Sequence, residues 1–139
     1  MNSYEKLKLL VLEDPDVAPV ILDLLESFKD KGFEHWIEPI VAEDLVQACE
    51  KLAQADMALI DIGRSEEHKN FAIAVLGECG MPIILTSALP QHKSIKDNAM
   101  VGFISKPKYS LEKITQDLTR LGRIALNKKA LSKERILII

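Results

Sequence analysis

The stretch Met57-Ala58-Leu59-Ile60-Asp61 is a short apolar run that ends in a carboxylate. Near-continuous apolarity of this kind is typical of a strand that is covered on both faces of a parallel sheet. Four further runs of similar length predict strands: Lys8–Leu12, His35–Ile40, Pro82–Leu85 and Val101–Ser105. Pro39 lies in the second run along the chain, and because proline cannot donate a ladder hydrogen bond, that run should form an edge strand.

Amphipathic stretches separate these runs and predict helices, because apolar residues recur in them at helical spacing. The predicted helices extend over about 16–31, about 43–54, a segment around 71–76, about 90–100 and about 110–127. In the second helix we expect Leu45, Val46, Cys49 and Leu52 to share one apolar side. Gly32 and Gly80 are stop signals, and Ser110 is the expected N-cap of the last helix.

A strand followed by a helix, repeated five times, predicts an α/β fold. Crossovers between parallel strands are almost always right-handed, which leaves few arrangements of the sheet. We therefore expect a doubly wound (βα)5 sandwich of the flavodoxin-like type, with the parallel sheet in the order 2-1-3-4-5.

Polar residues stand where four of the five apolar runs stop. Glu13 and Asp14 follow the first run, Asp61 the third, Thr86 the fourth and Lys106 the fifth. In the order 2-1-3-4-5 these four strands are neighbours, and the edge strand contributes none of the set. Because ligands of open α/β sheets bind beyond the carboxyl ends of the strands, we expect these side chains to form one site.

The chemistry of such a site favours a hard cation. Three carboxylates repel one another unless a positive charge lies among them. An oxygen-only donor set suits Mg²⁺, which binds through one or two carboxylates together with a substrate phosphate. Asp61 is then a candidate nucleophile for a phosphoryl group. Lys106 and the Thr86 hydroxyl are candidates for contacting the phosphoryl oxygens.

With these motifs in order, the sequence resembles the CheY-like receiver domains of bacterial response regulators in two-component systems, over about 7–123. The resemblance rests on the acidic pair, on Leu59-Ile60-Asp61, on Thr86-Ser87 and on Lys106-Pro107. It implies phosphorylation of Asp61 by a histidine kinase or phosphotransfer protein. It also implies a Mg²⁺ site, whose ligands would be Glu13, Asp14, Asp61 and the backbone carbonyl of Gly63.

The resemblance further implies a switch in which phosphorylated Asp61 draws the Thr86 hydroxyl inward and Phe103 turns from exposed to buried. The face of the fourth helix, fifth strand and fifth helix would then change shape for a partner. Pro107 would have a structural role, since the Lys106–Pro107 bond is commonly cis in that family. Gly63 and Ala88 occupy positions that tune loss of the phosphoryl group, so we expect slow self-dephosphorylation.

The loop at 62–67 departs from the family pattern, since it lacks the usual proline and later glycine and is several residues short. The main alternative is therefore a receiver-like module that binds protein partners without phosphorylation. A magnesium phosphatase of the haloacid-dehalogenase type needs a second acid two residues after its nucleophile, where Gly63 stands, so we expect no enzyme activity. Taken alone, the acidic pair Glu13-Asp14 is also a plain N-cap signal for the first helix.

The remaining features set broader expectations. A net charge of −3 with mixed signs gives no reason to expect nucleic acid as a partner. No apolar stretch is long enough for a membrane span, and the N-terminal residues lack the pattern of a signal peptide. Cys49 and Cys79 read as reduced thiols in or near the core of a cytoplasmic protein. His35, His68 and His92 read as surface residues, because they lack metal-ligand spacing.

The C-terminal residues predict a division of the chain at Asn127. We expect a receiver domain over 1–127 and a tail over 128–139, which ends Ile136-Leu137-Ile138-Ile139. Four terminal apolar residues would pack on their own domain or on a second copy, and we favour self-association as a homodimer.

Overall fold

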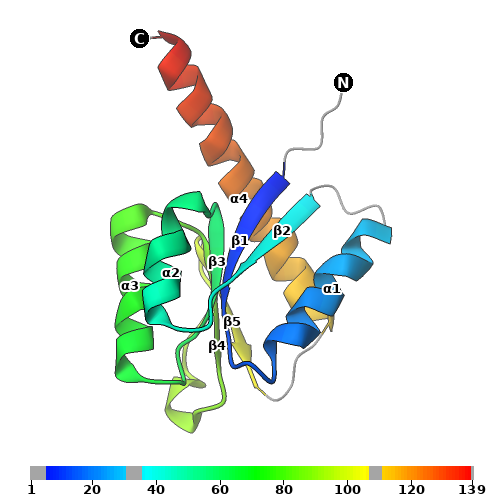
Figure 1. The fold of residues 1–139 in the computed structure, drawn as a ribbon, viewed down its shortest axis with the longest axis vertical. Coiled ribbons are helices and arrows are strands. Elements are labelled where there is room, and N and C mark those ends of the chain that lie inside the picture. The colour runs from blue at the N-terminus through cyan, green and yellow to red at the C-terminus, as the bar shows by residue number, and fades with distance from the viewer. Residues whose placement is uncertain (1–5, 31–35, 107–110, 139) are drawn as a thin grey trace.

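Figure 1 shows the chain as a computed structural model that describes residues 6–30, 36–106 and 111–138. Its core is one sheet of five parallel strands in the order β2-β1-β3-β4-β5. The strands are β1 (Lys6–Leu12), β2 (Trp36–Val41), β3 (Met57–Asp61), β4 (Ile83–Ser87) and β5 (Val101–Ser105). The predicted order is confirmed, and β2, which contains Pro39, lies at the edge.

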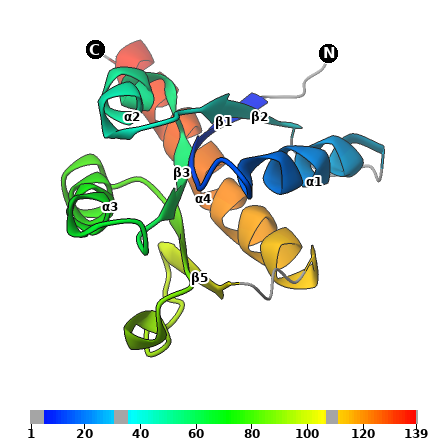
Figure 2. The same ribbon diagram turned by 60° about the horizontal axis from the view of Figure 1, so that its bottom comes forward.

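Two helices cover each face of the sheet, as Figure 2 shows most clearly. The helices are α1 (Ala18–Asp30), α2 (Leu45–Lys51), α3 (Glu66–Cys79) and α4 (Leu111–Ile138), with short 3-10 turns η1 (Leu52–Gln54) and η2 (Pro90–His92). The two-residue period of the strands divides the core between the faces. On β1, Leu9 and Val11 pack with α1 and α4, whereas Leu10 and Leu12 pack with α2 and α3.

The predicted helix over 90–100 is wrong: η2 is its only helical part, and 93–100 is irregular. Local hydrogen bonds from side chains to the backbone compete with helix formation there. Asp97 Oδ1 accepts the Phe103 N–H at 2.8 Å, and Asn98 Oδ1 accepts the Met100 N–H at 2.9 Å. Arg120 of α4 also donates to the Asn98 carbonyl at 2.6 Å. These contacts fix the segment near β5, where Ile95 and Met100 pack against the core cluster without forming a helix.

The predicted apolar side of the second helix is half right. Leu45 and Leu52 pack against the core together with the buried Ala48, whereas Val46 is 66% exposed and Cys49 is exposed as well. Cys49 and Cys79 are free thiols, as predicted, but both lie on the surface instead of in or near the core. A short helix with a small inward residue can place its larger apolar neighbours outside, which the apolar pattern alone does not reveal.

The last helix also runs further than predicted. Instead of ending near Asn127, α4 continues without a break to Ile138. The division into a domain and a tail at Asn127 stays a prediction. No helix in the described ranges combines the length and the apolarity that crossing a membrane requires. Several residues with predicted roles lie outside the described ones: Gly32, His35, Pro107, Ser110 and Ile139.

Two glycines provide a matched test of this packing. A Cβ added to Gly102 on β5 would lie 2.5 Å from Oδ2 of Asp117, a buried carboxylate of α4 that pairs with Lys113. A Cβ added to Gly77 of α3 would meet nothing within 4 Å. We expect Gly102→Ala to lower the free energy of unfolding by about 1–3 kcal/mol. We expect Gly77→Ala to raise it by about 0.5–1 kcal/mol, because alanine favours a helix. Urea denaturation measures both, and an unchanged stability of Gly102→Ala would contradict the close approach of α4 to β5.

Candidate functional site

The parallel register aligns the carboxyl ends of the central strands at one edge of the sheet. Leu12 of β1 pairs with Ile60 of β3, and Asp61 pairs with Thr86 of β4. Beyond β5, the Lys106 N–H donates to the Ser87 carbonyl at 2.8 Å and so extends the ladder. The residues that follow these strands therefore lie together, as the sequence predicts.

A single ammonium group joins two buried carboxylates at this edge. Lys106 Nζ donates to Glu13 Oε1 at 2.9 Å and to Asp61 Oδ2 at 2.7 Å. The other oxygen of Glu13 accepts the Thr86 hydroxyl at 2.7 Å, and Asp61 Oδ1 accepts the Gly63 N–H at 2.9 Å. Glu13, Asp61 and Thr86 are all buried. Four of the residues predicted from strand ends therefore form one hydrogen-bonded cluster.

Burial and charge shift two pKa values in this cluster. Burial raises the pKa of Asp61 above its ordinary 3.8, and the neighbouring Glu13 adds to this, although the hydrogen bond from Lys106 acts in the opposite direction. For Lys106, burial alone would lower the pKa, but the hydrogen bonds and attraction of Asp61 and Glu13 outweigh it and raise the pKa above 10.5. Lys106 is therefore a permanent cation, whereas the negative charge on Asp61 is costly.

The side chain of Asp14 does not join the cluster, although its backbone N–H donates to Glu13 Oε1 at 2.8 Å. Its Oδ1 accepts the Asp16 N–H at 2.9 Å, and its carbonyl accepts the N–H groups of Val17 and Ala18 at 2.8 and 2.9 Å. This is an Asx turn that opens α1. The Asp14 side chain thus stabilises the turn that leads into α1, and the N-cap reading of the acidic pair stays a prediction.

The donor set fits a hard divalent cation in part. Glu13 and Asp61 already converge on one positive charge, and both present oxygen, the ligand that Mg²⁺ prefers. Within the described ranges, however, no group of three or more His, Cys, Asp or Glu side chains is placed to hold a metal ion. Two buried carboxylates are thus available to a cation, and Asp14 would have to release the Asp16 N–H to become the third.

Ser87 and His92 stand beside this cluster, and sequence reasoning missed their contact. The Ser87 hydroxyl lies 2.6 Å from His92 Nδ1 and accepts the Leu89 N–H at 3.0 Å. His92 is buried, so its predicted surface position is wrong. Pro90, at the start of η2, gives the only sequence signal, because a helical turn begun there brings residue 92 back toward the strand end.

Gly63 and the first turn of α3 form the neighbouring wall. A Cβ on Gly63 would lie 2.9 Å from the Ser87 hydroxyl and 3.3 Å from Asp61 Oδ1, so the glycine leaves room for that hydroxyl. Ser65 caps α3 by accepting the His68 N–H at 3.1 Å, and its hydroxyl lies 2.6 Å from His68 Nδ1. His68 Nε2 is buried and has no hydrogen-bond partner among the described residues. His68 is therefore partly buried instead of lying on the surface.

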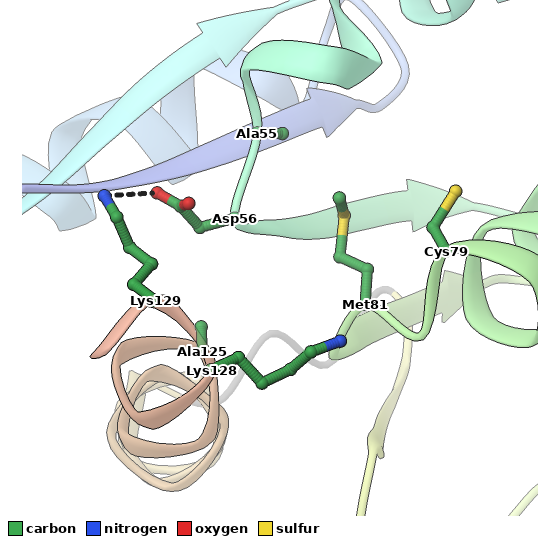
Figure 3. A pocket seen from close by; sticks show the side chains of 7 residues that line it. All are labelled: Ala55, Asp56, Cys79, Met81, Ala125, Lys128 and Lys129. Carbon is green, nitrogen blue, oxygen red and sulfur yellow. Dashed lines mark hydrogen bonds and ion pairs between the residues drawn. The ribbon is translucent and has the colours of Figure 1, made fainter. Parts of the chain in front are cut away.

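A second cavity, of about 370 Å³, lies at the opposite edge of the sheet and is shown in Figure 3. Its charged groups already have structural partners. Asp56 accepts the Lys8 N–H at 2.8 Å and lies 3.3 Å from the Lys129 ammonium. Lys128 donates to the carbonyl of Gly80, the left-handed residue that ends α3. These contacts attach α4 to the amino-terminal edge of the sheet, so this cavity reads as a structural junction.

The pKa of Asp61 makes a prediction about stability and pH. Because the pKa is raised on folding, the protonated form favours the folded state below about pH 3.8, and this contribution is lost as the pH rises through the folded-state pKa. Asparagine mimics the protonated form, so Asp61→Asn should raise the melting temperature at pH 7. The gain should vanish below pH 4, and thermal denaturation across pH measures it. A lower melting temperature of the variant at pH 7 would mean that the Lys106 contact outweighs burial.

The contact between Gly63 and Ser87 makes a second prediction. Gly63→Ala should displace the Ser87 hydroxyl from His92 and lower the free energy of unfolding by about 1 kcal/mol. Ser87→Ala removes the obstructing oxygen, so adding Gly63→Ala to it should cost little. Urea denaturation of the two single variants and the double variant gives the coupling energy. Additive effects would show that the two residues do not meet.

No protein-family model matches this chain, and no curated protein sequence matches it either. Solved structures do match. A response regulator from Thermotoga maritima is 21% identical, over 83% of this chain and 99% of that protein, with a TM-score of 0.60. TrrA from the same organism, solved with Mg²⁺-BeF, is 18% identical over 83% of this chain and 98% of TrrA, with a TM-score of 0.61.

The PhyR stress response regulator is 18% identical, with a TM-score of 0.58. The match covers 86% of this chain but 46% of PhyR, so the chain spans less than half the length of that relative. At these identities the likeness establishes the fold. The chain therefore has the fold of response regulator receiver domains, as its strand-end motifs predicted.

Proposed function

We propose that this chain is a signalling switch that accepts a phosphoryl group on Asp61 from a histidine kinase or phosphotransfer protein in the cytoplasm. The observation that carries the proposal is the contact of 2.7 Å between the Lys106 ammonium and the buried Asp61 carboxylate. An ammonium beside a carboxylate at the carboxyl edge of a parallel sheet is placed to contact an oxygen of a group bound to that carboxylate. The fold shared with response regulators supports the same proposal.

In this reaction the Asp61 carboxylate attacks the phosphorus of a phosphohistidine. A new O–P bond forms, the P–N bond breaks, and the histidine keeps the electron pair and takes up a proton. A Mg²⁺ ion would supply positive charge for the phosphoryl oxygens. Glu13, Asp61 and the Gly63 carbonyl would hold it, with Asp14 once it is released from the Asp16 N–H. Because burial makes the charge on Asp61 costly, a bound cation would also favour its reactive, ionised form.

Thr86 is the residue whose hydrogen bond would change first when Asp61 is phosphorylated. Its hydroxyl now donates to Glu13, which is also bound by Lys106. A phosphoryl group on Asp61 would offer both donors a stronger acceptor. The strand end that carries Thr86 would then move, and Phe103, which is partly buried on the neighbouring β5, would follow. The partner face would include β5 and α4, but residues 93–100 would contribute as an irregular segment.

A second candidate function is protein binding without phosphorylation. One observation favours it, namely that within the described ranges no third acidic side chain joins Glu13 and Asp61 in a group placed to hold a metal ion. Under either function the tail over 128–139 is proposed to contribute to self-association of the domain at 1–127.

Phosphorylation can be tested directly. We expect incubation with acetyl phosphate and Mg²⁺ to add one phosphoryl group to Asp61, measured by intact mass, because the Lys106 ammonium lies 2.7 Å from its carboxylate. Asp61→Asn should abolish the addition. Asp56→Asn, which changes the acid just before the same strand, should leave it unchanged. If neither acetyl phosphate nor phosphohistidine donors modify the wild type, the phosphorylation proposal is wrong and protein binding without phosphorylation is the better account.

A further inference from the structure

One strip of the sheet lacks the helix that would normally cover it. Parallel sheets bury both faces, because every strand carries apolar side chains on each side. Helices α2 and α3 cover their face over β1, β3 and part of β4 (Figure 2), and among the described residues the 3-10 turn η2 is the only helical element between β4 and β5. The chain that connects these two strands makes only the turn η2 before it becomes irregular.

A groove of about 250 Å³ lies over this strip, although Ile83 and Val101 at its floor are themselves buried. Its floor is formed by Ile83 and Leu85 of β4 and by Val101 of β5, and one wall is α3, with Ile73 and Leu76. Ile73 is 59% exposed, an unusual position for a large apolar side chain beside other apolar residues. A continuous apolar surface of this kind is the usual form of a groove that receives an amphipathic helix.

The irregular segment forms the other wall, where Ile95 packs against the core cluster that contains Ile83 and Val101. Asp97 in this segment pairs with Lys113 of α4 at 2.7 Å, and α4 lies on the opposite face of the sheet. Arg120 of α4 donates to the carbonyl of Val101 at 3.0 Å. The segment is thus tied toward α4 around the β5 edge, which keeps the groove open between Ile95 and α3.

The charges around the groove select its occupant. Among the described residues that line it, the charged ones are Lys69 on the α3 wall and Lys96 on the opposite wall. Neither lysine has an ion pair within the described part of the chain. A helix with acidic residues on both flanks of its apolar stripe would pair with both walls at once.

The C-terminal tail of a second copy is a poor fit. It is apolar at its end, but the residues before that end carry Lys128, Lys129, Lys133 and Arg135 against the single acid Glu134. Those charges would meet the two lysines of the groove as like charges. The occupant is therefore better sought on another protein.

From these observations we propose that the groove between α3 and 93–100 binds an acidic amphipathic helix of a partner protein, which packs against the exposed Ile73 of α3 and between the two lysines. This proposal does not rest on phosphorylation of Asp61, so either proposal can fail without the other.

A pair of synthetic helical peptides of about 15 residues tests the proposal. Both peptides carry leucines at helical spacing. The remaining positions are glutamates in one peptide and lysines in the other. We expect the glutamate peptide to bind about tenfold more tightly by fluorescence anisotropy, since each 1.4 kcal/mol is a factor of ten. It should also shift the amide signals of α3 and β5 in NMR spectra. Equal binding of both peptides, or shifts elsewhere, would overturn the proposal.

Variants on exposed positions separate the groove from other apolar surfaces. Ile73→Asp should weaken binding of the glutamate peptide about tenfold or more, whereas Val46→Asp, on the exposed side of α2, should leave it unchanged. Lys69→Glu combined with Lys96→Glu should reverse the preference and favour the lysine peptide. If sedimentation shows that the chain alone forms a dimer that Ile73→Asp dissociates, a second copy occupies the groove and the proposal is wrong.

Discussion

The ammonium of Lys106 holds carboxylates from two other strands, and the arrangement of the whole carboxyl edge depends on that contact. Glu13 follows β1 and Asp61 ends β3, so one positive charge beyond β5 joins three of the five strands. Burying two carboxylates without a cation would cost several kcal/mol. The hydroxyl of Thr86 and the N–H of Gly63 satisfy the remaining oxygens. The hydrogen bonds among these charged groups would rearrange when a ligand binds, because an added anion or cation would compete for the contacts of every member of the group.

Much of the sheet and of its polar edge can be read from the sequence, for a clear physical reason. Fully buried strands leave continuous apolar runs such as Met57–Asp61, and parallel topology brings the ends of such runs to one edge. The positions of Glu13, Asp61 and Lys106 follow from these two rules. Asp14 does not follow, because its side chain is used by the local turn into α1, and the choice between turn and site depends on backbone angles that the sequence pattern does not reveal.

The segment over 93–100 shows the limit of periodicity in another way. Its apolar spacing indicates a helix, but the bonds that replace the helix involve Lys113 and Arg120, which follow a whole strand later in the chain. Contacts of this range are invisible to a reading of local pattern. The Ser87–His92 contact was missed for a related reason, since it depends on a single turn at Pro90. The groove between α3 and 93–100 is a direct result of the missing helix in that segment.

The length of α4 gives the domain a mechanical property. The helix has 28 residues, which corresponds to about 42 Å. Its first half packs on the sheet, and Lys128 and Lys129 fasten it at the amino-terminal edge, after which about ten residues, or about 15 Å, extend onward (Figure 1). A rod held in this way acts as a lever with its pivot at the two lysines. Tilting the packed half by about 10° would carry the far end through about 3 Å, so a repacking beneath β5 would be transmitted to the opposite end of the molecule.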